Sequence, residues 1–183
     1  MTPRSRSDEA SGAMTGEVYP LDTSHVEDAT ALLTRAFFDY PMWRWIMPDE
    51  DHRRRALPIS ARATIQWGAM LGEMFALGDP MRGVAVWAGP GMADTDVDPD
   101  GSRFGWSEVE VAVGPVGMRR FEAMIEVQRP LREKYIPADG WYLAWLGVDP
   151  SLHRLGVGAT LLRDMLASKG PMMHKRRRAH RSR

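Results

Sequence analysis

The feature that most constrains this chain is the stretch 141-WYLAWLGVDPSLHRLGVGATLL-162. Residues 141–148 are almost wholly apolar, which predicts a strand buried on both faces in the interior of a sheet. Gly156 and Gly158 follow, and beyond them apolar residues recur at helical spacing at Val157, Leu161, Leu162 and Met165. The stretch therefore predicts a buried strand, a glycine turn and a helix over about 157–168.

Such a turn can bind a phosphate group. The first turn of a helix leaves its N–H groups unpaired and carries the positive end of the helix dipole. Glycine removes the β-carbon where a ligand would approach the backbone, and His153, Arg154 and Thr160 add side-chain donors. The two glycines could equally serve only a tight turn, because neither the P-loop pattern nor the dinucleotide fingerprint is present.

The rest of the chain predicts a mixed α/β fold. A capping box of Ser24 and Glu27 starts a helix that should end before Pro41, and Pro58 should kink or split a second helix. We expect strands at 17–22, 73–78 and 83–89, the last two forming an antiparallel hairpin, and helices at 26–37, 50–71, 106–113 and 117–134, with an exposed loop at 89–105. These elements predict a central mixed, mostly antiparallel sheet flanked by helices.

Composition excludes several classes of protein. The 183 residues are 44% hydrophobic and 26% charged, which suits one globular domain. The absence of cysteine excludes disulfides, thiolate metal sites and cysteine catalysis. The histidines lack the spacing of metal ligands, so we expect no metal site: His25, His52, His174 and His180. No run is long and apolar enough to cross a membrane and no signal peptide is present, which predicts a cytoplasmic protein.

The segment around the two glycines resembles motif A of the Gcn5-related N-acetyltransferases, a family that binds acetyl-CoA. Gly156 and Gly158 match the two small positions of the Gln/Arg-x-x-Gly-x-Gly/Ala pattern. His153 departs from the usual Gln or Arg, and Leu155 stands where a basic residue is common. The segments 31–41, 83–90 and 141–162 are similar, in order and spacing, to the puromycin N-acetyltransferase-like branch. The resemblance covers roughly residues 17–168.

The resemblance implies an enzyme that transfers acetyl from acetyl-CoA to a primary amine of a small molecule, by direct attack in a ternary complex. The residues that it assigns to acetyl-CoA are Leu146, Gly147, Val148, His153, Arg154, Leu155, Gly156, Val157, Gly158, Ala159 and Thr160. The N–H of Val148 is the implied oxyanion donor or acetyl anchor.

The catalytic acid and base are harder to assign. The family's Asn-x-x-Phe-Tyr stretch, whose tyrosine protonates the leaving thiolate, is absent from this sequence. Tyr142 and Glu126 are the remaining candidates, although Tyr142 could belong to the core and Glu126 to a solvated helix face. Four clustered aromatic residues could line a pocket for the amine and attract its positive charge by cation–π contact, or could simply pack against one another: Phe37, Tyr40, Trp43 and Trp45.

The last segment, 175-KRRRAHRSR-183, holds six of the 24 basic residues and no acidic residue. It could be an arm for nucleic acid, an inert tail, or the product of a frameshift or premature stop. We expect the last, which gives a disordered N-terminus at 1–15, an acetyltransferase domain at 16–168 without its C-terminal strands, and a basic disordered tail at 169–183. Strand 141–148 would then have an exposed edge. Such a chain could bind acetyl-CoA without turnover.

The alternative function is a non-catalytic protein whose basic tail binds nucleic acid or an acidic partner. The acceptor amine, the oligomeric state and the choice of Met1 or Met14 as first residue stay open at this point.

Overall fold

The computed structural model describes residues 16–90, 104–137 and 140–174, and the elements below refer to that part of the chain. Four strands form one sheet: β1 (Val18–Pro20), β2 (Gly72–Leu77), β3 (Gly83–Ala88) and β4 (Tyr142–Val148). The helices are η1 (Thr23–His25), α2 (Val26–Phe37), α3 (Pro41–Ile46), α4 (Glu50–Leu71), α5 (Trp106–Tyr135), η3 (Pro150–Leu152) and α6 (Val157–His174). This arrangement confirms the predicted α/β class.

The sheet has the order β1-β2-β3-β4, so β4 lies at one edge of the described sheet. All three pairings are antiparallel, including the predicted β2–β3 hairpin, in which Phe75 lies opposite Ala85. No parallel pairing occurs among the described strands. Six of the seven residues of β4 are partly exposed, so the expectation of a strand buried on both faces is wrong. An edge strand keeps one flank open, which explains that exposure.

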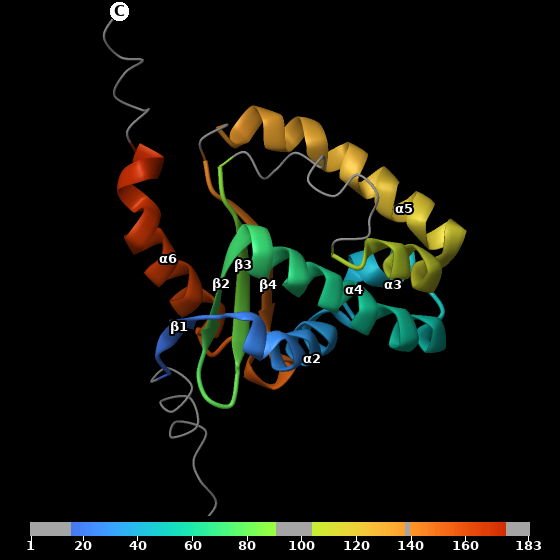
Figure 1. Ribbon diagram of the computed structural model, residues 1–183, viewed down its shortest axis with the longest axis horizontal. Helices are drawn as coiled ribbons and strands as arrows, with labels where there is room; N and C mark the ends of the chain where they lie inside the picture. The colour runs from blue at the N-terminus through green and yellow to red at the C-terminus, as the bar shows by residue number, and fades with distance from the viewer. Residues whose placement is uncertain (1–15, 91–103, 138–139, 175–183) are drawn as a thin grey trace, which may run out of the picture.

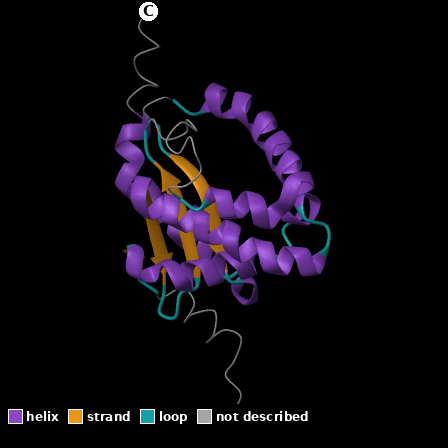
Figure 2. Ribbon diagram, turned by 45° about the vertical axis from the view of Figure 1, so that its right-hand side comes forward, coloured by secondary structure: helices purple, strands orange, loops and turns teal. Residues whose placement is uncertain are grey.

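Helices cover both faces of the sheet. Figures 1 and 2 show α6 against one face, α2 and α4 against the other, and α3 and α5 stacked beyond α4. No helix in the described part of the chain has the length and hydrophobicity needed to span a bilayer. The predicted acetyl-CoA turn lies between β4 and α6, while the aromatic segment of α3 lies on the α4 side.

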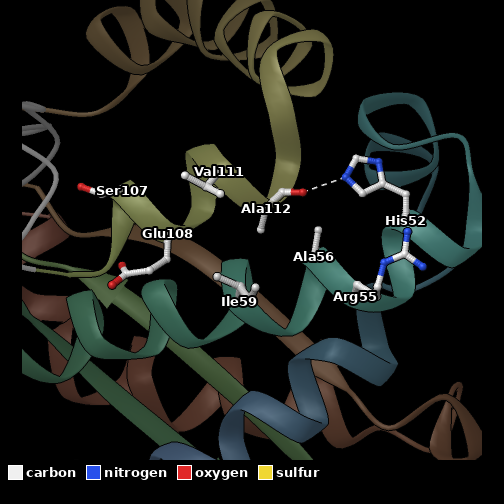
Figure 3. Close-up of a pocket in the computed structure, with 8 residues that line it drawn as sticks. All are labelled: His52, Arg55, Ala56, Ile59, Ser107, Glu108, Val111 and Ala112. Atoms are coloured by element: carbon white, nitrogen blue, oxygen red, sulfur yellow. Dashed lines mark hydrogen bonds between the residues drawn. The ribbon is translucent and has the colours of Figure 1, made fainter.

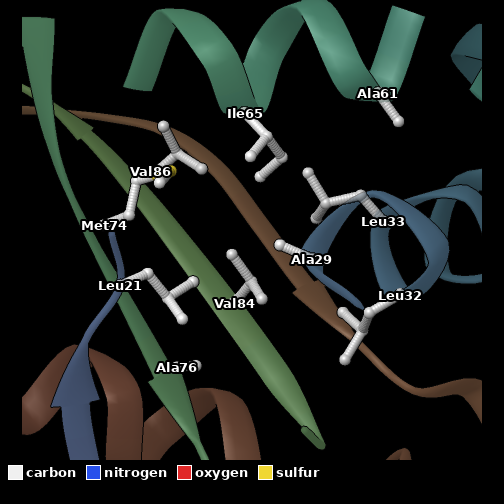
Figure 4. Close-up of a cluster of buried hydrophobic side chains, with 10 residues drawn as sticks. All are labelled: Leu21, Ala29, Leu32, Leu33, Ala61, Ile65, Met74, Ala76, Val84 and Val86. Carbon is white, nitrogen blue, oxygen red and sulfur yellow. The ribbon is translucent and has the colours of Figure 1, made fainter. Parts of the chain in front are cut away.

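Three apolar clusters hold these layers together. The first fills the space between the sheet and the α2–α4 pair and includes Leu33, Ile65 and Val86 (Figure 4). The second joins α3, α4 and α5 around Trp43, and the third joins the sheet to α6. Among residues 157–167 of α6, Val157, Leu161 and Met165 are buried at the predicted helical spacing, whereas Leu162, predicted on the same face, is partly exposed.

Proline and glycine act differently in the two long helices. Pro58 lies inside α4, which runs unbroken from Glu50 to Leu71, so of the predicted kink or split the split is wrong. Proline removes one backbone bond, but buried Leu57 and Ile65 on either side anchor the helix to the core. In α5 the break predicted at 114–117 is confirmed, because Gly114 adopts φ 73° and ψ 167° there.

Other boundaries differ slightly. The capping box is wrong: Asp22 caps η1 by accepting from the N–H of Ser24, and no side chain caps α2 at His25. The side chain of Ser24 donates to Asp22 instead. Helix α6 continues to His174 rather than ending near 168. The expected disordered start at 1–15, most of the 89–105 loop and the basic segment 175–183 lie outside the described residues.

Candidate functional site

The turn between β4 and α6 is built by a short series of backbone hydrogen bonds. The N–H of Asp149 donates to the carbonyl of Arg82 at 2.9 Å, which ends the strand. The N–H of Leu155 then donates to Leu152 at 3.3 Å, and Thr160 donates to Gly156 at 2.9 Å. The N–H of Thr160 makes the first helical hydrogen bond of α6. The N–H groups of the residues before it, in the first turn, are those that a helix leaves unpaired.

Two residues in this turn have left-handed backbone conformations. Gly156 has φ 83°, and Arg154 has φ 67°. Among the described residues Arg154 is the one non-glycine residue with positive φ, a conformation that is uncommon for such residues and costs free energy. Its side chain and that of His153 are exposed. The turn is therefore a strained connection that presents two polar side chains beside a helix N-terminus, which marks it as a candidate functional site.

The glycines of the motif have separate structural roles. A β-carbon on Gly158 would lie 3.5 Å from Val148 Cγ2 and 3.6 Å from Leu146 Cδ2, which is ordinary contact with β4. A β-carbon on Gly147 would lie 2.5 Å from Leu33 Cδ2, so that glycine lets α2 approach the sheet. Gly156 is required for its φ, whereas Gly147 is required for packing.

Asp149 fixes the start of the turn. It accepts from the hydroxyl of Ser151 at 2.7 Å and from its N–H at 3.1 Å, and forms an ion pair with Arg35 of α2 at 3.0 Å. The hydrogen bond from the Ser151 hydroxyl contributes most to holding the pKa of Asp149 below its ordinary value, and partial burial opposes it. Asp149 therefore stays ionised near neutral pH and joins β4 to α2.

The ladder between β3 and β4 contains an irregularity. Val86 pairs with Trp145, but the next residue of β3, Trp87, pairs with Leu143, so Ala144 is an extra residue in β4. A β-bulge of this kind leaves the extra residue unpaired and is common beside active sites. The bulge also lets Trp145 face α2 and α4 while Leu143 faces α6.

The two catalytic candidates lie away from the turn. Tyr142 begins β4, and the guanidinium of Arg132 lies 5.8 Å from its ring centroid. Glu126 is exposed on α5 and pairs with Arg129 at 2.6 Å. The structure does not bring these two side chains to the glycine turn, and their catalytic roles stay predictions.

The aromatic group divides into packed and exposed members. Trp43 is 2% exposed and stacks on Phe121 at 6.2 Å, with Trp145 at 5.9 Å on β4. Phe37 meets the edge of Trp145 at 4.8 Å. Packing therefore accounts for Trp43 and Phe37. Tyr40 and Trp45 are about half exposed and could contact a ligand.

Three features of the site had no clear signal in the sequence. Nothing about Arg154 indicates positive φ, because that conformation is signalled by glycine or asparagine. The bulge at Ala144 and the ion pair between Arg35 and Asp149, which are 114 residues apart, depend on the tertiary fold. Within the described residues no three His, Asp or Glu side chains gather in a group that could hold a metal ion.

No protein-family model matches this chain, and no curated protein is significantly similar to it. Solved structures similar to this chain in three dimensions include two whose descriptions name acetyltransferases. A mosquito arylalkylamine N-acetyltransferase like 5b aligns with a TM-score of 0.48 and 16% identity, over 86% of this chain and 72% of its own. A TM-score this low carries no argument about the fold.

The other is a structure from Corynebacterium glutamicum described as histone acetyltransferase HPA2 and related acetyltransferase. It aligns with a TM-score of 0.55 and 21% identity, over 84% of this chain and 71% of its own. The chain therefore has the fold of an acetyltransferase.

Proposed function

We propose that this chain is an N-acetyltransferase that transfers the acetyl group of acetyl-CoA to a primary amine of a small molecule. The observation that carries the proposal is the turn between β4 and α6, where Arg154 and Gly156 take left-handed conformations immediately before the helix. The fold similarity supports the same reaction class. In this proposal the enzyme works in the cytoplasm, as the sequence predicts.

The donor would be held by the turn. The unpaired amides of Val157, Gly158 and Ala159 suit the pyrophosphate of acetyl-CoA, because they combine donors with the positive end of the α6 dipole. His153 and Arg154 are exposed beside them and would donate to the same phosphates. The other residues predicted to bind acetyl-CoA lie on either side of this turn: Leu146, Gly147 and Val148 at the end of β4, and Thr160 in α6.

The reactive group would lie farther along β4. A pantetheine arm that follows the strand from the turn passes from Val148 toward Ala144, about 13 Å away at strand spacing. The deprotonated acceptor nitrogen attacks the acetyl carbonyl carbon, so that a C–N bond forms and the oxygen takes the negative charge. A backbone N–H at the Ala144 bulge, or that of Val148, would stabilise this oxygen. The C–S bond then breaks, and the CoA thiolate takes up a proton.

The acceptor would approach from the side of α3 and α5. Trp145 faces that side and contacts Trp43 and Phe37. The ring of half-exposed Tyr40 lies 5.5 Å from that of Phe37, and Arg120 of α5 donates to the carbonyl of half-exposed Trp45 at 2.8 Å. These rings would attract an ammonium group by cation–π contact. Tyr142 and Glu126 remain the proposed sources of proton transfer, with the α5 flank as their common location.

Thermal unfolding with and without acetyl-CoA tests the binding step. A ligand at 100 times its Kd stabilises a protein by about 2.7 kcal/mol, which raises the melting temperature of a domain of this size by roughly 5–11 °C. Release of free thiol in the presence of a panel of primary amines tests turnover. Absence of both signals would refute the proposal, whereas a melting shift without thiol release would leave a binding protein that does not catalyse.

The alternative from the sequence, nucleic-acid binding, depends on residues 175–183. Salt-sensitive DNA binding that is lost when these residues are deleted would support it. The same deletion should leave the acetyl-CoA shift unchanged, because α6 begins at Val157.

A further inference from the structure

A groove on the opposite side of the sheet from α6 runs between the first half of α4 and the first half of α5 (Figure 3). Its volume is about 590 Å³. One wall consists of residues at helical spacing on α4, from His52 to Ile59, and the other of residues on α5, from Ser107 to Ala112. His52 Nε2 contacts the carbonyl of Ala112 at 2.7 Å. Because a carbonyl only accepts, Nε2 carries the proton, and this bond holds the two helices at a fixed spacing.

The groove combines an apolar floor with a projecting side chain. Ala56, Ile59 and Ala112 form the floor, and Ala56 is 1% exposed. Val111 lies at the rim of the groove and is 85% exposed, which is the highest exposed fraction of any large hydrophobic residue in the described part of the chain. No described residue of this chain covers that valine, so it loses contact with water only if something beyond the described residues covers it.

The two ends of the groove carry opposite charges. Figure 3 shows Arg55 at one end, beside His52, and Glu108 at the other, beside Ser107. Neither Arg55 nor Glu108 has an ion-pair partner among the described residues. Within the described part of the chain both charges are therefore free to pair with a partner that presents the opposite pattern.

We propose that a second copy of this chain covers the groove in a twofold-symmetric dimer. In such an interface each residue meets the partner in a reciprocal pair. Rotation by 180° sets Arg55 against Glu108 of the partner subunit, and Glu108 against Arg55 of the partner subunit. Val111 of each protomer then enters the apolar floor of the other. The groove thus contains both a projection and the cavity that receives it, together with charges that complement themselves.

This arrangement leaves the proposed acetyl-CoA turn free in both protomers, because α6 and α4 cover opposite faces of the sheet (Figure 1). The dimer therefore does not depend on the proposed function. It would also fix the first half of α5, ahead of the break at Gly114, while the second half lies outside the interface.

Sedimentation equilibrium of the full chain tests the proposal. The wild-type chain should sediment as a concentration-dependent dimer, and Val111→Asp should raise the dissociation constant at least about tenfold, because it places a charge in the apolar centre. Val127→Asp is the matched control: Val127 is 68% exposed on the same helix but lies beyond Gly114, so it should not change the dissociation constant. Thermal melts check that both variants fold.

Charge exchange separates this geometry from other dimers. Arg55→Glu and Glu108→Arg should each weaken the dimer at least about tenfold, because like charges then meet twice. The double variant should recover affinity to within a few-fold of wild type. A chain that stays monomeric at all concentrations would overturn the proposal, with a small ligand as the remaining occupant. A dimer that is indifferent to Val111→Asp, or that the double variant fails to restore, would overturn it as well.

Discussion

Gly156→Ala and Gly158→Ala add the same methyl group at two positions of the turn into α6, and the structure predicts opposite effects. Gly156 has φ 83°, where a residue with a β-carbon pays about 1–2 kcal/mol. That cost corresponds to a melting temperature lower by roughly 2–8 °C for a domain of this size. The β-carbon of Gly158→Ala would meet Val148 and Leu146 at 3.5 and 3.6 Å. That contact is unstrained, and alanine favours a helix over glycine by up to about 1 kcal/mol.

Ligand binding should separate the two variants further. Gly156→Ala pulls the turn away from its left-handed conformation and should abolish most of the acetyl-CoA melting shift. Gly158→Ala directs its methyl group toward β4, away from the exposed amides, and should keep that shift. Differential scanning fluorimetry with and without acetyl-CoA measures both effects in one experiment. A Gly156→Ala protein as stable and as responsive as Gly158→Ala would refute the reasoning.

Four further substitutions test the packing and the hydrogen bonds around the site. Gly147→Ala should lower stability by about 1–3 kcal/mol through overpacking, because its β-carbon would lie 2.5 Å from Leu33 Cδ2. Trp43→Ala should cost about 3–5 kcal/mol in the buried cluster, whereas Trp45→Ala, at a residue 49% exposed, should cost under about 1 kcal/mol. Asp149→Asn should cost about 1 kcal/mol at pH 7, since it weakens charge-assisted hydrogen bonds at a partly exposed site.

The pH dependence of the last variant follows from the direction of the pKa shift. The pKa of Asp149 is lowered in the folded chain, mainly by the Ser151 hydroxyl. Its contribution is therefore complete above the ordinary pKa of about 3.9 and is lost as the pH falls through the lower folded value. The free energies of unfolding of wild type and Asp149→Asn, measured with urea, should differ at pH 7, and this difference should disappear below about pH 4. A difference that is constant with pH would contradict the assigned bonds, and equal unfolding of the two tryptophan variants would contradict the packing of α3.

The order of the strands and helices could be predicted because each depends on local signals. Short apolar runs separated by turn residues indicated β2 and β3, helical spacings indicated α2 and α6, and Gly114 signalled the break in α5. Of the kink or split predicted at Pro58, the split does not occur, because the cost of one missing hydrogen bond is outweighed by core contacts that the local sequence does not show. The burial of β4 on both faces was misjudged because an apolar run indicates a strand but not how fully its neighbours cover it, whereas the expected exposed edge agrees with the position of β4 at the edge of the described sheet.

The site was predictable in part. Gly156 could be identified because glycine is the usual residue at positive φ, and its φ of 83° agrees with a tight turn. Arg154 at φ 67° could not be identified, since its conformation is imposed by the turn around it. The groove between α4 and α5 also had no sequence signal, because His52 and Ala112 meet only after both helices pack.

Isothermal titration calorimetry of acetyl-CoA into the full chain tests the central claim, that the turn between β4 and α6 binds the pyrophosphate of acetyl-CoA. Acetyl-pantetheine, which lacks that group, is the comparison ligand, and Gly158→Ala is the matched control for Gly156→Ala. The account predicts that acetyl-CoA binds to wild type and to Gly158→Ala, and that removing the pyrophosphate or introducing Gly156→Ala weakens binding at least about tenfold. Absence of binding to wild type, or equal affinity for acetyl-CoA and acetyl-pantetheine, would contradict it.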